Sequence, residues 1–217
     1  LTNKDFKKYA KYINYGFCNA CASGHLEIVK YLLTSPELKK HADIHTANDY
    51  GFIWACYYGH LEVVKYLLER GADIHAHNGG ALLSSAFLGH LDIVKYLIHN
   101  GICSGIRYDD ALRCACVYGN LDIVIYLLQN GFDVHYNNDS VLIETAFRGY
   151  VEIVKVLLEY GANINFTKGF IHFSIKDERF VLIDDNGKIT KLKPEIQSEL
   201  YNYHYRDNAA KSTTIKN

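Results

Sequence analysis

One ten-residue segment recurs along the chain at a nearly constant interval. Gly24–Leu33 reads Gly-His-Leu-Glu-Ile-Val-Lys-Tyr-Leu-Leu, close copies begin at Gly59 and Gly89, and looser copies begin at Gly119 and Gly149. The successive glycines are 35, 30, 30 and 30 residues apart. A unit of this length cannot bury its own apolar face, so self-similarity at such a period predicts a stack of small units that share one elongated core.

Each unit divides into two short predicted helices around the glycine. The segment after the glycine carries Glu or Asp in its first turn, where the helix dipole favours negative charge. Its apolar residues form a wide stripe suited to burial between neighbours. In the second copy they are Leu61, Val63, Val64, Leu67 and Leu68. The segment before the glycine carries a pair of small residues, which lets adjacent helices approach closely. The long first interval is explained by an insertion in a turn near Pro36.

Residues 16–167 resemble the ankyrin family. The glycine-led segment, followed by Gly-Ala-Asp-Ile as at 71–74, is specific to that family. The resemblance implies an all-α solenoid of five helix-turn-helix repeats. Two features differ from the family pattern: the Thr-Pro-Leu-His start of the first helix is absent, and the period is 30 rather than about 33 residues. The shortening implies short finger loops, and the 30-residue form is similar to the ankyrin families of giant DNA viruses.

Four segments are expected along the chain. Residues 1–15 are predicted to form an N-terminal capping helix, and residues 16–167 the five repeats. Residues 168–193 are predicted to form a β-hairpin extension, because an Asn-Gly pair at 186–187 separates two β-rich runs. Residues 194–217 are predicted to form a short helix and a disordered tail. A sixth repeat is not expected, because its glycine would fall on Arg179.

The cysteines and histidines invite a metal or redox hypothesis, which the repeat makes unnecessary. Cys21, Cys56 and Cys116 occupy the slot that Ala86 and Ala146 fill in other repeats. A small buried residue is what that slot needs, and a free cysteine behaves as a small hydrophobe. The histidines after the corner glycines are expected to bond loop backbone, and repeated histidines would lie roughly 10 Å apart, too far for shared ligation. Those corner residues are His25, His60 and His90, and a second row consists of His45, His75 and His135. No metal and no cofactor is predicted.

Several function classes are disfavoured by the composition. The net charge is −1 and the pI is about 6.9, which disfavours nucleic acid as the main partner. There is no membrane-length apolar run. No phosphate-binding loop and no catalytic motif stands out, so the chain is predicted not to be an enzyme. The enzyme or metal alternative would use the C-terminal extension around His172, Asp184 and Asp185.

The candidate binding site lies on the first helices. In the ankyrin arrangement these helices line the concave face, and the residues five, two and one before the corner glycine point away from the small buried pair. Aromatic residues and arginine dominate binding hot spots. The candidate partner-binding residues are Trp54, Tyr57, Tyr58, Phe87, Leu88, Tyr118, Phe147 and Arg148. The competing interpretation, that the residues two before the glycine pack against the neighbouring helix, stays open for Tyr57, Phe87 and Phe147.

The sequence thus predicts a non-enzymatic protein–protein interaction scaffold that binds another protein on its concave face. We expect a monomer, located inside cells in the cytoplasm or the nucleus, with neither nucleic acid nor membrane as partner. The alternative is a substrate-recruiting adaptor for a ubiquitin ligase whose ligase-binding segment is missing from this chain. It follows from the resemblance to the viral families, because many viral ankyrin proteins have that plan.

Overall fold

The computed structural model describes residues 3–38, 41–102, 108–137, 140–163, 171–174, 179–183 and 189–202. Two compact units make up the chain, Leu1–Ala115 and Cys116–Asn217. Helices account for nearly all of the described secondary structure, in agreement with the predicted helical repeat solenoid.

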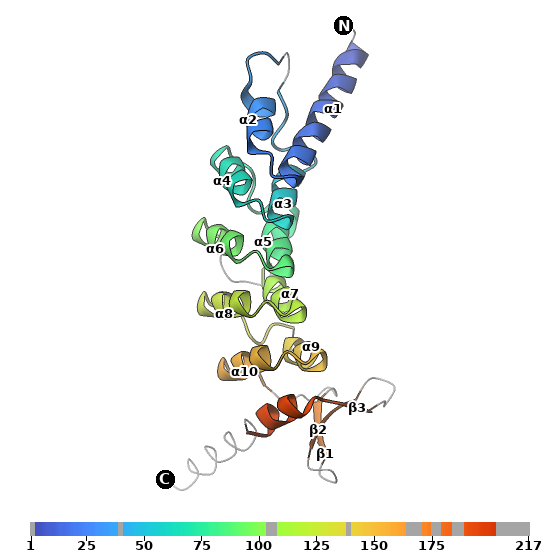
Figure 1. Ribbon diagram of the computed structural model, residues 1–217, viewed down its shortest axis with the longest axis vertical. Coiled ribbons are helices and arrows are strands. Elements are labelled where there is room, and N and C mark those ends of the chain that lie inside the picture. The colour runs from blue at the N-terminus through green and yellow to red at the C-terminus, as the bar shows by residue number, and fades with distance from the viewer. Residues whose placement is uncertain are drawn as a thin grey trace. The chain divides into compact units, whose positions relative to one another are not determined.

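The first unit consists of helix pairs. Its helices are α1 (Asn3–Ala22), α2 (Leu26–Thr34), α3 (Tyr50–Tyr57), α4 (Leu61–Glu69), α5 (Ala76–Leu88) and α6 (Leu91–His99). The first helices α1, α3 and α5 pack against one another in sequence order, and the second helices α2, α4 and α6 form a parallel row (Figure 1). The helix α7 (Asp110–Tyr118) spans the division between the units.

The second helices bury the predicted apolar stripe at its centre. In α4, Val63, Val64 and Leu67 are buried, whereas Leu61 and Leu68 at the margins are half-buried. Burial of one such aliphatic side chain contributes about 1.5–3 kcal/mol. The row of second helices therefore supplies much of the apolar stabilisation of each repeat.

The first helix is longer than a single ankyrin helix. α1 runs without a break through the boundary expected between residues 1–15 and the first repeat. Its buried residues Ile13, Phe17, Ala20 and Cys21 follow a helical spacing that continues across that boundary. One apolar stripe therefore keeps the N-terminal extension and the first repeat in a single helix.

The loop before α3 has an uncommon backbone. Ala47, Asn48 and Asp49 all have φ between 52° and 61°, the left-handed region. Asp49 is only 3% exposed, and its Oδ1 accepts a hydrogen bond of 3.0 Å from the backbone N–H of Asp73 in the following repeat. The Nδ1 of His45 donates to the same carboxylate at 3.1 Å. A buried carboxylate thus holds the left-handed turn and ties it to the next repeat.

The second unit combines helices with a small sheet. It contains α8 (Leu121–Gln129), α9 (Ser140–Arg148), α10 (Val151–Glu159) and a helix over residues 194–202. The strands β1 (Ile171–Ser174), β2 (Arg179–Ile183) and β3 (Ile189–Lys191) pair antiparallel in the order β1-β2-β3. The Asn-Gly pair at 186–187, from which the hairpin was predicted, lies outside the described residues.

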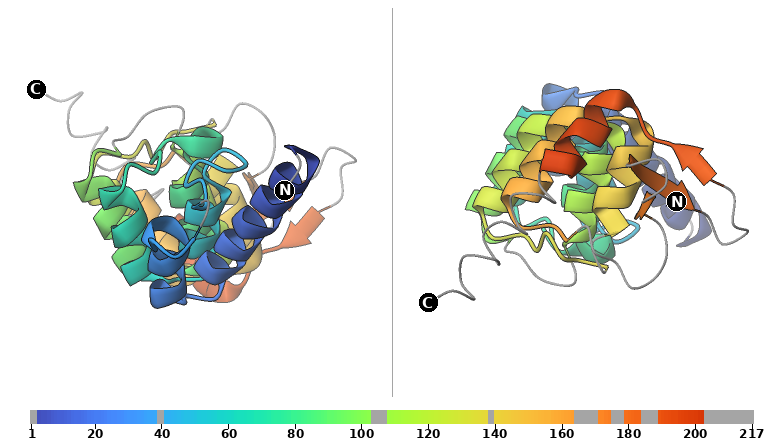
Figure 2. Two further views of the ribbon diagram at one scale, coloured as in Figure 1. Left: turned by 90° about the horizontal axis from the view of Figure 1, so that it is seen from above. Right: turned by 90° about the horizontal axis from the view of Figure 1, so that it is seen from below.

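The helix at residues 194–202 has the register of a second ankyrin helix. Ile196 and Leu200 are fully buried, at the same spacing as Val63 and Leu67 of α4. A Cβ atom at Gly149 would collide with the side chain of Lys193, just as one at Gly24 would collide with the ring of His60 in the first unit. The helix lies beside α10 (Figure 2), and Lys155 Nζ is 3.8 Å from Glu199 Oε1. The helix therefore occupies the place of the second helix of a sixth repeat, although the sequence predicted no sixth repeat.

Candidate functional site

Four aromatic side chains gather along one side of α3. Tyr50, Trp54, Tyr57 and Tyr58 are separated by four, three and one residues, so they fall on one face of the helix and its C-terminal end. The opposite face carries buried small residues and Phe52, which pack the repeat. This division of α3 into a packing face and an aromatic face follows directly from the sequence. We call the four side chains the aromatic patch.

The rings of the aromatic patch contact one another in defined geometries. Trp54 lies at the centre, with its ring centroid 5.4 Å from each of Tyr50, Tyr57 and Tyr58. The first two contacts are edge-to-face and the third is stacked. Aromatic pairs of this kind contribute about 0.5–1.5 kcal/mol beyond the area they bury. The rings are therefore held in place before any partner arrives, and Tyr58 still leaves 49% of its surface exposed.

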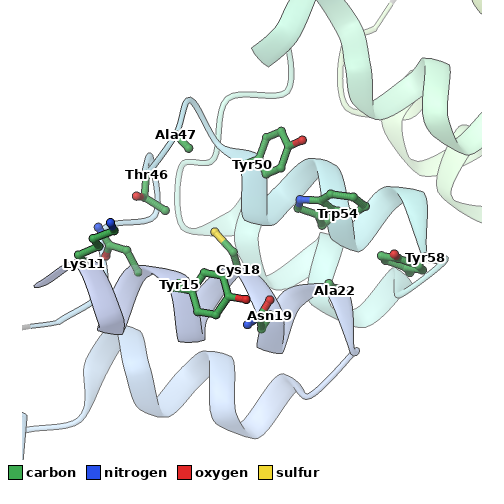
Figure 3. A pocket seen from close by; sticks show the side chains of 11 residues that line it. Lys11, Tyr15, Cys18, Asn19, Ala22, Thr46, Ala47, Tyr50, Trp54 and Tyr58 are labelled. Atoms are coloured by element: carbon green, nitrogen blue, oxygen red, sulfur yellow. The ribbon is translucent and has the colours of Figure 1, made fainter. Parts of the chain in front are cut away.

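A cleft opens between the aromatic patch and α1 (Figure 3). Its volume is about 730 Å³, within the range of about 300–1,000 Å³ that is typical of ligand pockets. We call it the N-terminal cleft. The residues that line it are Lys11, Asn14, Tyr15, Cys18, Asn19, Ala22, Thr46, Ala47, Tyr50, Trp54 and Tyr58. Three of the four aromatic-patch residues thus form one of its walls.

The cleft exists because the first repeat is poor in large side chains where the second is rich. Asn19 and Ala22 on α1 occupy the repeat positions that Trp54 and Tyr57 occupy on α3. The change from short to aromatic side chains between adjacent helices leaves a hollow. None of the binding residues predicted from the sequence lies in the first repeat, whereas the structure places Asn19 and Ala22 in the cleft lining.

Two tyrosines of the cleft were missed from the sequence. Tyr15, which is 68% exposed, and Tyr50 each lie nine residues before the corner glycine of their repeat. Figure 3 shows them on opposite sides of the cleft, Tyr15 on α1 and Tyr50 at the start of α3. The shared repeat position was the signal that could have identified both.

The polar groups of the cleft are few. Lys11 is the one charged side chain among the described residues that line it. The sulfur of Cys18 lies between the two helices and points toward the cleft (Figure 3). Cys18 is a free thiol, and partial burial raises its pKa above the ordinary value. The cleft is therefore mainly apolar, with a cation at one end and a thiol on its floor.

The loop that closes one end of the cleft is fixed from both sides. Thr46 and Ala47 line the cleft, and the turn that contains Ala47 is held by the buried Asp49. The backbone oxygen of Ala47 also accepts a 3.3 Å hydrogen bond from Nε2 of His77, at the start of α5. The ring of His77 meets Tyr50 edge-on at 5.6 Å. The wall is thus connected to the repeat that follows.

The other predicted binding residues are placed as follows. In α5, Phe87 is half-buried and Leu88 is exposed. In the second unit, Phe147 is 65% exposed, and the guanidinium carbon of Arg148 lies 5.8 Å from the ring centroid of Tyr118, a cation–π contact. Of the three positions whose role stayed open, Tyr57 and Phe87 are partly packed and Phe147 is available to solvent.

The cysteine and histidine predictions can be compared with the structure. Cys21, Cys56 and Cys116 are all buried, as the shared small slot requires. The Nε2 of His60 donates to the backbone oxygen of Ala22, and that of His90 to the oxygen of Tyr57, both at 2.9 Å. These bonds confirm the predicted role of two corner histidines, and each one links a repeat to its predecessor.

The described part of the chain contains neither a cluster of potential metal ligands nor a membrane-spanning helix. Among those residues no group of three or more potential metal ligands is found. Within the same ranges, no helix is long and apolar enough to cross a membrane. The side chain of His172 and residues 184 and 185, on which the enzyme alternative depends, lie outside what the structure describes.

The repeat pattern is matched by a known family model. The model described as ankyrin repeats (3 copies) matches residues 17–108 and 82–168, which together span every one of the five glycine-led segments. No curated protein sequence matches the chain. Stacked helix pairs, corner histidines that bond the preceding repeat and a family match over most of the sequence all agree. The chain belongs to the ankyrin-repeat family, whose repeats generally mediate protein–protein interactions.

Proposed function

We propose that this chain is a non-enzymatic scaffold that binds a partner protein through the aromatic patch of α3. One observation carries the proposal: Trp54 holds three tyrosine rings in contact around it, next to an open cleft. Tryptophan and tyrosine are enriched among the residues that contribute most to binding, particularly where they are rigid and centrally placed. α3 is also one of the first helices, which the resemblance to ankyrin repeats predicts to line the concave face.

The rigidity of the patch favours affinity. A flexible surface loses conformational freedom when it binds, at a cost of about 0.5–1.5 kcal/mol for each side chain that becomes fixed. Ring contacts already restrict Trp54 and Tyr58, and the packing of α3 restricts Tyr57. A partner that covers the patch therefore gains apolar contact area with a reduced ordering cost.

Further predicted residues extend the proposed site. Phe87 and Leu88 lie on α5, which packs directly against α3. In the second unit, Tyr118, Phe147 and Arg148 form a separate candidate surface, with Arg148 next to the Tyr118 ring. The ubiquitin-ligase adaptor alternative has no support among the described residues and stays a prediction.

The test compares partner capture by three forms of the full chain. Proteins captured by the wild-type chain are identified, and the affinity of a purified partner is measured by calorimetry. The variant Trp54→Ala is expected to weaken binding by about 30-fold or more, the effect of losing a hot spot worth at least about 2 kcal/mol.

Tyr160→Ala provides the matched control. Tyr160 is an aromatic residue of similar exposure to Tyr58, and it lies at the end of α10. This variant should bind as the wild type does. Equal affinity of the wild type and Trp54→Ala, with unchanged circular dichroism spectra, would exclude the aromatic patch as the binding site.

A further inference from the structure

We infer that the N-terminal cleft receives a large apolar side chain of an acidic peptide segment in the partner. The inference rests on the proposed function, because the cleft and the aromatic patch share Tyr50, Trp54 and Tyr58. It goes beyond that function in naming the chemistry of the partner segment. The shape of the cleft, the charge around it and the lack of a carboxylate among its described lining residues together support this partner chemistry.

The walls of the cleft favour an apolar guest. Tyr15 contributes a ring from α1, and Tyr50 and Trp54 contribute rings from α3 on the opposite side (Figure 3). Ala22 and the Cys18 thiol complete the apolar surface between them. Aromatic side chains pair well in offset or edge-on contacts with other aromatic rings. An aromatic or large aliphatic side chain from a partner would thus be enclosed on two sides.

The charge around the cleft favours an acidic peptide. Lys11 lies at the cleft, and the sequence places Lys4, Lys7 and Lys8 one to two turns earlier on α1 at helical spacing from it. Asp5 is the only acidic residue in the first 26 positions of the chain. Opposite charges on the two partners steer association and fix the orientation of the bound peptide. A carboxylate next to the apolar anchor would meet Lys11.

Two other guests are disfavoured by the same residues. A lysine or arginine side chain would gain cation–π attraction from the aromatic faces, but among the described lining residues it would meet Lys11 and no carboxylate. A single-stranded nucleic acid could stack its bases, but tracking of its backbone requires a positively charged groove. The described lining of the cleft contains one cation, and the whole chain has a net charge of −1.

The experiment begins with an unbiased peptide selection on the full chain. A phage library of random twelve-residue peptides is selected for binding to the wild-type chain, and phages that also bind the Trp54→Ala variant are removed by counter-selection. The expected result is enrichment of sequences that combine a Trp, Phe, Tyr or Leu with neighbouring Asp or Glu. Enrichment of basic or uncharged sequences that depend on Trp54 would overturn the acidic-peptide inference while leaving the proposed function intact. Failure to enrich any Trp54-dependent sequence would overturn the inference as well.

Cys18 reports whether a selected peptide occupies the cleft. The synthetic peptide is added at saturation, and alkylation of Cys18 at pH 8 is followed by mass spectrometry, with Cys18→Ser as the control for assignment. Occupancy should slow alkylation about tenfold or more, because a bound anchor would exclude the reagent from a thiol that points toward the cleft. An unchanged rate at saturating peptide would place the peptide elsewhere and overturn the inference.

Charge reversal at Lys11 tests the electrostatic part. Lys11→Glu should lower the affinity for the selected peptide about fivefold at low salt, which is the effect of an exposed ion pair. The difference in affinity between the variant and the wild type should shrink as the salt concentration rises. Lys95→Glu, an exposed lysine on α6, makes the same change in net charge and should leave affinity unchanged. An equal loss of peptide affinity in both variants would contradict a site for an acidic peptide. Protection of Cys18 by a twelve-nucleotide single-stranded DNA would also contradict it.

Discussion

Replacement of Asp49 by alanine tests whether a single buried carboxylate holds the repeat junction. The carboxylate is almost fully buried and accepts bonds from the Asp73 N–H in the next repeat and from His45. Alanine would leave that N–H without its partner, which costs about 1–3 kcal/mol. It would also place an alanine at φ 61°, a conformation that costs about 1–2 kcal/mol for a residue that cannot bond locally.

The expected sum is a loss of about 3 kcal/mol. The bond from His45 adds little, because the histidine side chain is 57% exposed and water competes for it. For a chain of this size, about 1 kcal/mol lowers the melting temperature by about 2–4 °C. Asp49→Ala should therefore melt about 6–12 °C below the wild type.

Urea unfolding followed by circular dichroism measures this loss, with two companion variants. Asp49→Asn keeps an acceptor for the Asp73 N–H and tolerates the left-handed backbone, so its free energy of unfolding should fall by about half as much as that of Asp49→Ala. Asp92→Ala removes an exposed acid from the first turn of α6 and should cost about 0.3–1 kcal/mol. If Asp49→Ala proved no more damaging than Asp92→Ala, the buried carboxylate could not be what holds the junction.

Three further predictions follow from particular contacts. Gly24→Ala should destabilise the chain by at least about 1 kcal/mol more than Gly71→Ala. Both glycines have positive φ, but only at Gly24 would the new Cβ collide with a neighbour, the ring of His60. Equal melting temperatures of the two variants would contradict the collision. Burial raises the pKa of the Cys21 and Cys56 thiols, so the folded chain keeps protons that the unfolded chain loses, and stability should fall above about pH 8.5 by up to about 1.4 kcal/mol per thiol and pH unit. Comparison of urea midpoints at pH 7 and pH 10 with those of a double alanine variant checks this, and an equal pH dependence of the two proteins would refute it. Asn19→Trp should fill the N-terminal cleft and abolish the protection of Cys18 by the selected peptide. Because Asn19 is exposed, the melting temperature should stay within about 2 °C of the wild-type value. Retained protection of Cys18 would show that the peptide does not need the cleft.

The sequence predicted the features that depend on one repeat alone. The repeat period predicted where the helix pairs lie. The spacing of apolar residues predicted the buried centre of each second helix, for example Val63, Val64 and Leu67. The small slot that contains Cys21 and Cys56 was visible because equivalent residues could be compared between repeats. Trp54 and Tyr58 were also predicted as accessible, since their positions point away from that slot.

Features that depend on two repeats together were not predicted. The N-terminal cleft is a difference between α1 and α3, and neither Asn19 nor Ala22 is informative without the aromatic residues opposite. The helix at 194–202 was predicted, but its register as a second ankyrin helix was missed for a related reason. That register is defined by Lys193 against Gly149, residues that are far apart in sequence, and the described residues just before the helix form strands rather than a first helix. Side chains that contact each other but lie far apart in sequence leave no local periodic pattern from which the contact could be predicted.

The separation of packing and binding positions explains how such a chain acquires a site. Two residues that are adjacent in each first helix behave differently from repeat to repeat. The position three before the corner glycine stays small and buried, as Cys56, Ala86 and Cys116 illustrate. The next position changes freely, from Ala22 in the first repeat to the half-buried Tyr57 in the second. Because the stack depends on the constant position, the variable one can take an aromatic or a short side chain at small cost in stability. A cleft then forms wherever a repeat with short side chains adjoins one with large ones, and α1 beside α3 is such a place.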